Sequence, residues 1–243
     1  MLFSVEAVKA LKDIVRPLKH AAFGLTDIYR WVTLIQAARP ERIRVVFDVG
    51  ASIGEKTLLF LRSFPAATVY CVEPRPDALT RLRHRTRRFA GRTVPLQMAL
   101  HREERLIDLH LASYGDASSL LGLEGLENDQ IQFVGRLPVT ARRLDRLAEE
   151  QGVTRIDVLK VDVEGLELEV LEGAGSLLTS AILNLIVEIS PLRKGPRSAD
   201  HIRLFELLHR AGFAYIGCDV DYFFSKDPLV LSRFGFPVAV GRS

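Results

Sequence analysis

From residue 44 onward the sequence alternates short apolar runs with longer amphipathic stretches, and this alternation constrains the fold more than any other feature. Such alternation is typical of βαβ units, which build a mostly parallel α/β sheet covered by helices. A segment at 100–140 interrupts the pattern and predicts a strand hairpin followed by a glycine-rich loop. The expected strands are 44–49, 68–73, 93–98, 156–162, 184–189, 213–218 and 236–241. The expected helices are 54–63, 76–89, 141–151, 166–178 and 199–211.

The first forty residues have a different pattern, in which apolar side chains recur at helical spacing. Pro17 and Gly24 divide this segment into two or three helices. We therefore expect two parts, an N-terminal helical arm at 1–40 and one catalytic-sized domain at 41–243. The arm could close the binding edge of the sheet as a lid, pack on the back of the sheet, or form a homodimer. We favour the lid as the prediction to test.

The composition limits the classes of partner and compartment. With 48% apolar and 26% charged residues, the chain resembles an ordinary globular protein, and a net charge of +3 favours anionic partners only weakly. Cys71 and Cys218 are too few and too far apart for a zinc site or a disulfide framework, which favours a reducing cytoplasm. Charged residues interrupt the apolar pattern of the N-terminus, so we expect neither a signal peptide nor a transmembrane segment.

Polar side chains gather where the expected strands end. Ligands of open parallel sheets bind beyond the carboxyl ends of the strands, at the point where the strand order reverses. Five carboxylates at one such edge are unusual for a solvated surface, so the sequence predicts a binding site there. The residues expected at this edge are Asp48, Gly50, Gly54, Glu73, Lys160, Asp162, Glu164 and Glu188.

The stretch at 45–57, "VVFDVGASIGEKT", predicts a strand that ends in a glycine turn. Gly50 lets the chain leave the strand with an unrestricted φ, and Gly54 lets the next helix begin close to a ligand. The spacing Asp-x-Gly-x-x-x-Gly lacks the Gly-x-Gly of dinucleotide folds and the Lys-Ser/Thr pair of phosphate-binding loops. A ligand without phosphates therefore fits better, although tight turns also use glycine without any ligand.

Glu73 ends the second expected strand, 25 residues after Asp48. An acidic side chain at this position can accept hydrogen bonds from both hydroxyls of a ribose. The alternative is an exposed acid at a strand end, without a ligand. A ribosylated ligand that lacks a pyrophosphate matches S-adenosylmethionine.

Several stretches together resemble the FkbM-type methyltransferase family in their order and spacing, over roughly 43–241. They are "FDVGASIGEKT", "VYCVEPRP", "DASSL", "VTARRLD", "IDVLKVDVEGLELEVLEGA" and "LIVEIS". The resemblance implies an S-adenosylmethionine-dependent class I methyltransferase on a Rossmann-like sheet of seven mostly parallel strands with an antiparallel last strand. It also implies O-methylation of a hydroxyl on a sugar, a glycan or a natural product.

The resemblance further assigns cofactor contacts to particular positions. Ser52 stands where the family usually has asparagine, and we expect this serine to cap the following helix. Glu73 would hold the ribose, and Asp162 would lie near the amino group or the transferring methyl. The residues implied at the methionine end are Asp48, Gly50, Ala51 and Gly54, and those flanking adenine are Met98 and Ala99.

Methyl transfer to an alcohol needs a positioned oxygen and a group that removes its proton. We favour Glu188 as this base, followed by Glu164, with Lys160 as a further candidate. Lys160 paired with Asp162 or Glu188 is the alternative, because a lysine at a buried sheet edge is costly unless it is paired. The acidic residues Asp162, Glu164 and Glu188, with His101 nearby, could instead bind a divalent cation, but we expect no metal.

Alternative functions and partners make different demands on the sequence. A nicotinamide-dependent oxidoreductase would need the missing Gly-x-Gly, whereas a cofactor-binding scaffold without turnover stays open. The arginine-rich helix expected at 76–89 has few aromatic residues, which favours a solvated face over nucleic-acid binding. The basic loop expected after Glu188 could bind an anionic acceptor through Arg193, Lys194 and Arg197. The expected partner is a small-molecule or glycan hydroxyl acceptor.

Overall fold

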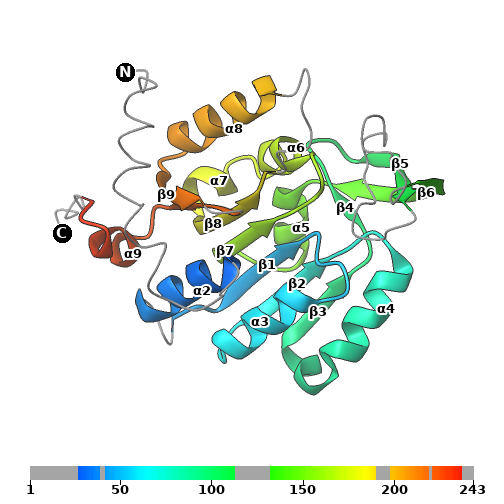
Figure 1. Cartoon of the computed structure of the whole chain (residues 1–243), viewed down its shortest axis with the longest axis horizontal. Helices are drawn as coiled ribbons and strands as arrows, with labels where there is room; N and C mark the ends of the chain where they lie inside the picture. Colours follow the sequence, from blue (N-terminus) through cyan, green and yellow to red (C-terminus); the bar gives the residue numbers. More distant parts are fainter. Residues whose placement is uncertain (1–26, 39–41, 113–131, 190–197, 219–220, 237–243) are drawn as a thin grey trace.

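A computed structural model describes residues 27–38, 42–112, 132–189, 198–218 and 221–236. Within these residues the chain forms a seven-stranded sheet in the order β3-β2-β1-β7-β8-β10-β9 (Figure 1). Its strands are β1 (Val45–Val49), β2 (Thr68–Val72), β3 (Thr93–Leu96), β7 (Ile156–Val161), β8 (Ile182–Glu188), β9 (Ala214–Cys218) and β10 (Asp221–Ser225).

The direction of the strands matches the expected architecture. β1 pairs in parallel with both β2 and β7, so the strand order reverses at β1, where ligands of such sheets bind. β10 is inserted between β8 and β9 and runs antiparallel to both. The expected α/β, Rossmann-like fold with an antiparallel last strand is therefore confirmed.

The position of the last strand differs from the expectation. We expected it at 236–241, but the antiparallel strand is β10, which begins only three residues after β9 ends. A short helix, α9 (Pro228–Arg233), follows β10, with Asp227 as its N-cap. Residues 237–243 lie outside the described residues.

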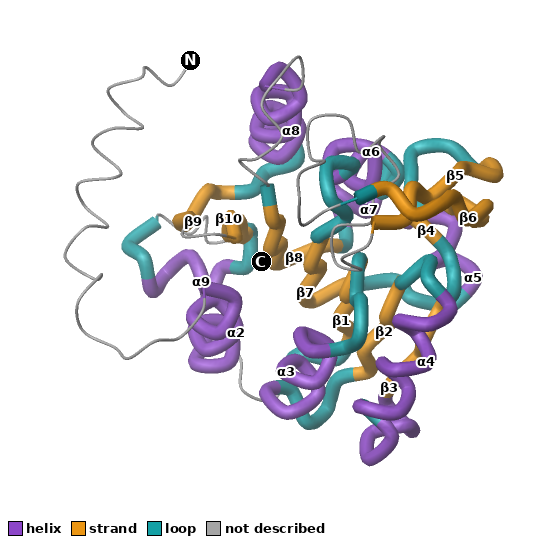
Figure 2. Tube along the Cα trace, turned by 45° about the vertical axis from the view of Figure 1, so that its right-hand side comes forward, coloured by secondary structure: helices purple, strands orange, loops and turns teal. Residues whose placement is uncertain are grey.

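Helices cover both faces of the sheet (Figure 2). Successive side chains of a strand such as β7 point to opposite faces of the sheet. Because helices cover both faces, β7 is buried along its whole length. One face packs against α2 (Asp27–Ala38), α3 (Glu55–Ser63), α4 (Pro76–Arg85) and α9. The other face packs against α5 (Leu144–Glu150), α6 (Glu167–Glu172), α7 (Leu177–Ser180) and α8 (Ser198–Arg210). The helix expected at 166–178 is thus two short helices.

The described part of the N-terminal arm is α2, which packs on a face of the sheet. Ile28, Trp31 and Ile35 are buried in the same core as residues of α3 and β10. The Trp31 ring stacks on Phe223 of β10 at 5.2 Å between ring centres. This part of the arm therefore packs against the sheet, while residues 1–26, 39 and 40 of the arm, on which the lid prediction mainly depends, lie outside the described residues.

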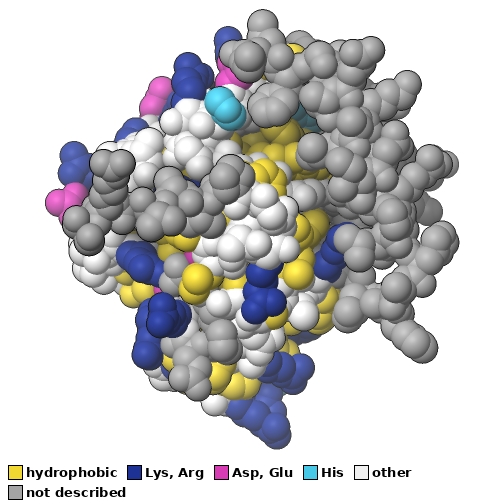
Figure 3. Space-filling view, turned by 90° about the vertical axis from the view of Figure 1, so that its left-hand side faces the viewer, with side chains coloured by type: hydrophobic (Ala, Val, Ile, Leu, Met, Phe, Trp, Pro, Cys, Tyr) yellow, Lys and Arg dark blue, Asp and Glu magenta, His cyan; other side chains and the backbone are white. Residues whose placement is uncertain are grey.

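A second, smaller sheet lies beside the main one. The second sheet, in the order β4-β6-β5, is made of β4 (Ala99–Leu100), β5 (Arg105–Ala112) and β6 (Phe133–Arg142). Its β5 and β6 pair antiparallel, as expected for the strand hairpin, and β4 runs parallel to β6. A 3₁₀ helix, η2 (Arg87–Arg92), follows α4. Lysine and arginine side chains gather on the lower half of the face shown in Figure 3, in line with the net charge of +3. Among the described residues, no helix combines the length and apolar character that crossing a membrane requires.

Candidate functional site

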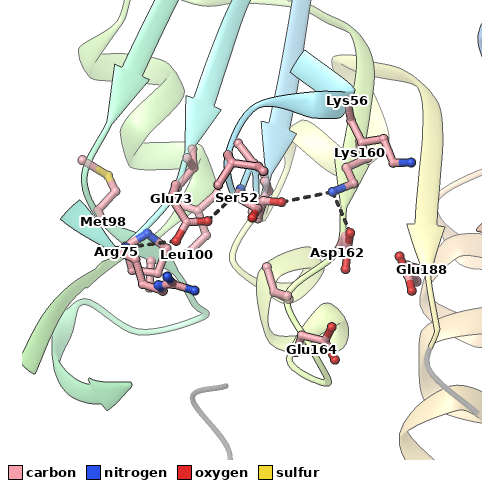
Figure 4. A pocket seen from close by; sticks show the side chains of 18 of the residues that line it. Ser52, Lys56, Glu73, Arg75, Met98, Leu100, Lys160, Asp162, Glu164 and Glu188 are labelled. Atoms are coloured by element: carbon pink, nitrogen blue, oxygen red, sulfur yellow. Dashed lines mark hydrogen bonds and ion pairs between the residues drawn. The ribbon is translucent and has the colours of Figure 1, made fainter. Parts of the chain in front are cut away.

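A pocket opens at the carboxyl edge of β1, β2, β7 and β8, where the strand order reverses (Figure 4). Its cavity volume of ≈ 290 Å³ is close to the lower end of the usual range for small-molecule sites. Asp48 and Gly54 do not line it. The predicted site residues that do are Gly50, Ala51, Glu73, Met98, Ala99, Lys160, Asp162, Glu164 and Glu188.

Gly50 is required by the backbone geometry of the turn. Its φ is +75°, and a Cβ placed there would lie 1.7 Å from the backbone oxygen of Asp162. Only a residue without a side chain therefore lets the turn after β1 lie against the end of β7. Gly54, the N-cap of α3, has a φ of +83°, and its Cβ would lie 2.8 Å from Cγ of Leu82 in α4. Gly54 therefore also lets α3 pack closely against α4, and its expected place at the methionine end of the cofactor stays a prediction.

Ser52 has a structural role other than the expected one. It adopts a left-handed conformation with φ of 44°, and its backbone N–H donates to Oε2 of Glu73 at 2.8 Å. The N-cap of α3 is Gly54, and no side chain caps this helix end. The expectation that Ser52 caps the helix is therefore wrong. Asparagine tolerates the left-handed region better than serine, which gives a physical reason for asparagine at this position.

The Glu73 carboxylate is held at the pocket wall by two backbone groups. Oε2 accepts from Ser52 N–H at 2.8 Å, and Oε1 accepts from Arg75 N–H at 3.0 Å. Burial raises the pKa of Glu73 above its ordinary value, against the two N–H groups, which favour the charged form. Each carboxylate oxygen can accept further hydrogen bonds, so the oriented carboxylate can receive a pair of hydroxyls from the pocket.

Lys160 lies at the base of the pocket, with 2% of its surface exposed. Its Nζ donates to Oδ2 of Asp162 at 2.8 Å and to the Gly50 carbonyl at 3.1 Å, and it lies 3.5 Å from Oδ1 of Asp48. Burial alone would lower the pKa of Lys160, but the charges of Asp162 and Asp48 more than offset burial, so its pKa is raised. The expected pair of Lys160 with Asp162 is thus present, and the lysine is a cation throughout the neutral range.

Asp48 lies behind the glycine turn and is completely buried. Its Oδ2 accepts from the Thr57 hydroxyl of α3 at 2.6 Å, and Lys160 lies beside Oδ1. Burial raises the pKa of Asp48, while Lys160 and Thr57 oppose the rise. Asp48 therefore links β1, α3 and Lys160 beneath the pocket, where it orients groups that line the pocket.

Glu188 belongs to a group of three carboxylates that we name the acidic cluster, comprising Asp162, Glu188 and Asp221. Glu188 lines the pocket at the end of β8, and Asp221 is its register partner at the start of β10. Burial, together with the charges of Asp162 and Asp221 and a hydrogen bond to Asp162, raises the pKa of Glu188 to about 8. Sequence reasoning missed Asp221, whose signal was its place at the start of the aromatic stretch 221–225, "DYFFS".

Glu164 lies in the turn after β7, and a second missed residue, Glu167, is the first residue of α6, which follows that turn. Glu164 lines the pocket and has a φ of 55°, which is uncommon for a residue with a side chain. The buried Glu167 carboxylate supports this turn, because Oε1 accepts from the N–H of Gly165 at 2.8 Å. Burial raises the pKa of Glu167. Within the described part of the chain, no group of three or more His, Cys, Asp or Glu side chains is arranged to hold a metal ion.

The side of the pocket beyond Glu73 is apolar. Met98 and Ala99 line it, together with Leu100 and Leu109. Such a wall suits a flat, weakly polar ring. The pocket thus joins an apolar wall, an oriented carboxylate suited to a diol, and a charged end near Lys160, and these three parts fit the adenine, ribose and methionine portions of S-adenosylmethionine.

Comparisons with known proteins identify the family of the chain. A family model described as the methyltransferase FkbM domain matches residues 48–215. The 2-O-methyltransferase NoeI of Sinorhizobium fredii is 29% identical over 70% of this chain and 71% of its own. The hexuronic acid methyltransferase AglP of Haloferax volcanii is 32% identical over 77% of this chain and 69% of its own.

A further relative is much larger than this chain. The AMB antimetabolite synthetase AmbE of Pseudomonas aeruginosa is 31% identical over 70% of this chain, which spans only 9% of AmbE. Family membership also supports the expected cofactor, S-adenosylmethionine, whose parts the pocket fits. The resemblance inferred from the sequence is confirmed, and the chain belongs to the FkbM methyltransferase family.

Proposed function

We propose that this protein transfers a methyl group from S-adenosylmethionine to a hydroxyl oxygen of a sugar, a glycan or a natural product. The proposal rests on one observation, that two carboxylates with different surroundings line the same pocket. Glu73 is oriented by two backbone N–H groups to accept a diol, and Glu188 lines the same opening with a raised pKa.

Different pocket residues would contact different parts of the cofactor. Glu73 would accept the ribose hydroxyls, Met98 and Ala99 would flank the adenine, and the backbone of Gly50 and Ala51 would border the methionine portion. Bound S-adenosylmethionine supplies an electrophilic methyl group on a positively charged sulfur. The protein's contribution is to hold the acceptor oxygen in line with that methyl, because positioning can be worth an effective molarity of about 10⁵ M or more.

Glu188 is the preferred base for the acceptor hydroxyl. As the new O–C bond forms, the bond between the methyl carbon and sulfur breaks and S-adenosylhomocysteine leaves, while the O–H proton passes to the Glu188 carboxylate. A pKa of about 8 makes this carboxylate a better proton acceptor than an ordinary glutamate, although less of it is ionised at neutral pH. Turnover should therefore rise as the pH increases toward and past 8. Lys160 is a poor base because it is a paired cation, and Glu164 is the second candidate.

The relatives support an acceptor class. The name of NoeI specifies a 2-O-methyltransferase, which favours transfer to oxygen here, and the name of AglP specifies a hexuronic acid methyltransferase, which favours a sugar acceptor. The 31-O-demethyl-FK506 methyltransferase FkbM of Streptomyces tacrolimicus, 32% identical over 60% of this chain, favours a natural product. The basic loop with Arg193, Lys194 and Arg197, proposed for an anionic acceptor, lies outside the described residues.

Calorimetry and a transfer assay together test the proposal. The protein should bind S-adenosylmethionine and S-adenosylhomocysteine, and it should ignore NAD, whose binding would favour an oxidoreductase. Glu73→Ala should weaken cofactor binding by about 2–4 kcal/mol, since hydrogen bonds to a charged acceptor are lost. Glu149→Gln, an exposed glutamate on α5, is the control. Cofactor binding without methyl transfer to any hydroxyl in a panel of glycans and macrolides would instead favour a scaffold.

A further inference from the structure

Asp221 and Glu188 are direct cross-strand partners in the ladder between β8 and β10. Side chains at directly opposed positions of antiparallel strands lie on the same face, with Cβ atoms about 4.5–5.5 Å apart. Like charges at such positions destabilise a sheet. Asp221 is also buried, with 6% of its surface exposed, so solvent screens the repulsion poorly. The pair lies beside the pocket, and ionising both carboxyl groups at once is therefore unfavourable.

The start of β10 is fixed by contacts from other elements. The indole N–H of Trp31, in α2, donates to the backbone carbonyl of Asp221 at 3.1 Å, and the indole ring stacks on Phe223. Gly217 of β9 leaves space for this ring, because a Cβ there would lie 2.9 Å from Cη2 of Trp31. The backbone of Asp221 is therefore clamped between α2 and the sheet, which limits how far its carboxylate can move away from Glu188.

We propose that Asp221 is a positioning residue that sets the charge state of Glu188, and that Trp31 holds Asp221 in place for this purpose. The inference rests on the proposed function, in which Glu188 accepts the proton of the acceptor hydroxyl. Asp221 does not line the pocket, so it acts through Glu188 and not on a substrate.

The charges around Glu188 determine the direction of the effect. Asp162 from the turn after β7 and Asp221 from β10 oppose ionisation of Glu188, whereas Lys160 from β7 favours it. The pocket wall adds Lys56 of α3 and Glu164. Removing the charge of Asp221 takes away one of the two opposing carboxylates. Glu188 should then ionise at lower pH, because a nearby like charge raises a carboxyl pKa.

The variant Asp221→Asn tests this in the cofactor-free protein. The Glu188 carboxyl signal, followed by ¹³C NMR and assigned with Glu188→Gln, should titrate about 0.5–1 pH unit lower than in the parent protein. Asp221→Glu keeps the charge and should restore the higher midpoint. Asp227→Asn is the matched control, since Asp227 is a buried acid just past the other end of β10 and asparagine also caps helices.

Two readouts separate this inference from the proposed function. An unchanged Glu188 midpoint in folded Asp221→Asn overturns the inference, whatever the protein catalyses. A lowered midpoint supports it, and the pH profile of kcat should then shift to lower pH by the same amount. If the midpoint falls but the kcat profile does not follow, Asp221 controls Glu188 but Glu188 is not the base. Should Asp221→Asn fail to fold, Asp221→Ser removes the same charge with a smaller side chain.

Discussion

Replacing Gly50 by alanine should damage both the stability of the fold and the pocket. A non-glycine residue in the left-handed region costs about 1–2 kcal/mol. The new Cβ would also lie 1.7 Å from the Asp162 backbone oxygen, where real contacts essentially never fall below 3.0 Å. The turn and the end of β7 must therefore separate by more than 1 Å. Two hydrogen bonds cross this gap, from Lys160 Nζ to the Gly50 carbonyl and from Asp162 N–H to the Val49 carbonyl, both 3.1 Å long.

These losses set the expected magnitude. Each hydrogen bond contributes about 0.5–1.5 kcal/mol, so Gly50→Ala should lose about 2–5 kcal/mol of unfolding free energy in total. Urea denaturation followed by circular dichroism measures this loss, and calorimetry with S-adenosylmethionine should show much weaker binding.

Gly212→Ala is the matched control for Gly50→Ala. Gly212 has a φ of +85°, but a Cβ there would meet no atom within 4 Å, so this variant should show only the backbone cost of about 1–2 kcal/mol. The reasoning would be refuted if Gly50→Ala were no less stable than Gly212→Ala and bound the cofactor as the parent protein does.

Three further outcomes are expected. Lys160→Met should cost about 3–5 kcal/mol, since it leaves Asp48 buried without its cation. Because the pKa of Asp48 is raised in the folded protein, protonation at lower pH should relieve this cost, and the stability difference measured by urea denaturation should narrow from pH 8 to pH 4. Ser52→Asn should stabilise the fold by about 0.5 kcal/mol, seen as a Tm about 1–2 °C higher, since asparagine tolerates a positive φ; a lower Tm would contradict this. Methyl transfer should persist in EDTA because Lys160 already pairs with Asp162, and activity that is lost in EDTA and restored by magnesium would contradict this.

The sequence predicted the parts of the site whose signals are local. Gly50 and Glu73 follow apolar runs directly, and the ends of parallel strands meet at one edge, so strand periodicity alone placed them together. The pairing of Lys160 with Asp162 followed from the cost of burying an unpaired lysine beside a sheet edge. Each of these inferences needed only the local sequence and one general rule about α/β sheets.

The sequence did not predict what depends on contacts between distant elements. Asp48 faces Thr57 and Lys160 behind the turn, and the motif alone does not show on which side of the loop its carboxylate lies. The contact of Gly54 with Leu82 needs the position of α4. Asp221 was missed because β10 follows β9 so closely that the sequence pattern indicates one strand followed by a loop. The last strand was instead predicted in the later apolar stretch at 236–241.

The hydrogen bond from Trp31 to Asp221 joins residues that are 190 positions apart. Closing so long a loop costs about 2 kcal/mol more entropy than closing one of 20 residues. The residues proposed to contact the cofactor on β1, β2 and β7 all precede β10 in the chain, so the strand that accepts the Trp31 hydrogen bond is made only in the last part of the described chain. Trp31 is the single tryptophan of the sequence, so its fluorescence is an intrinsic probe of this late docking step. In refolding experiments, cofactor binding should recover before the tryptophan signal reaches its native value.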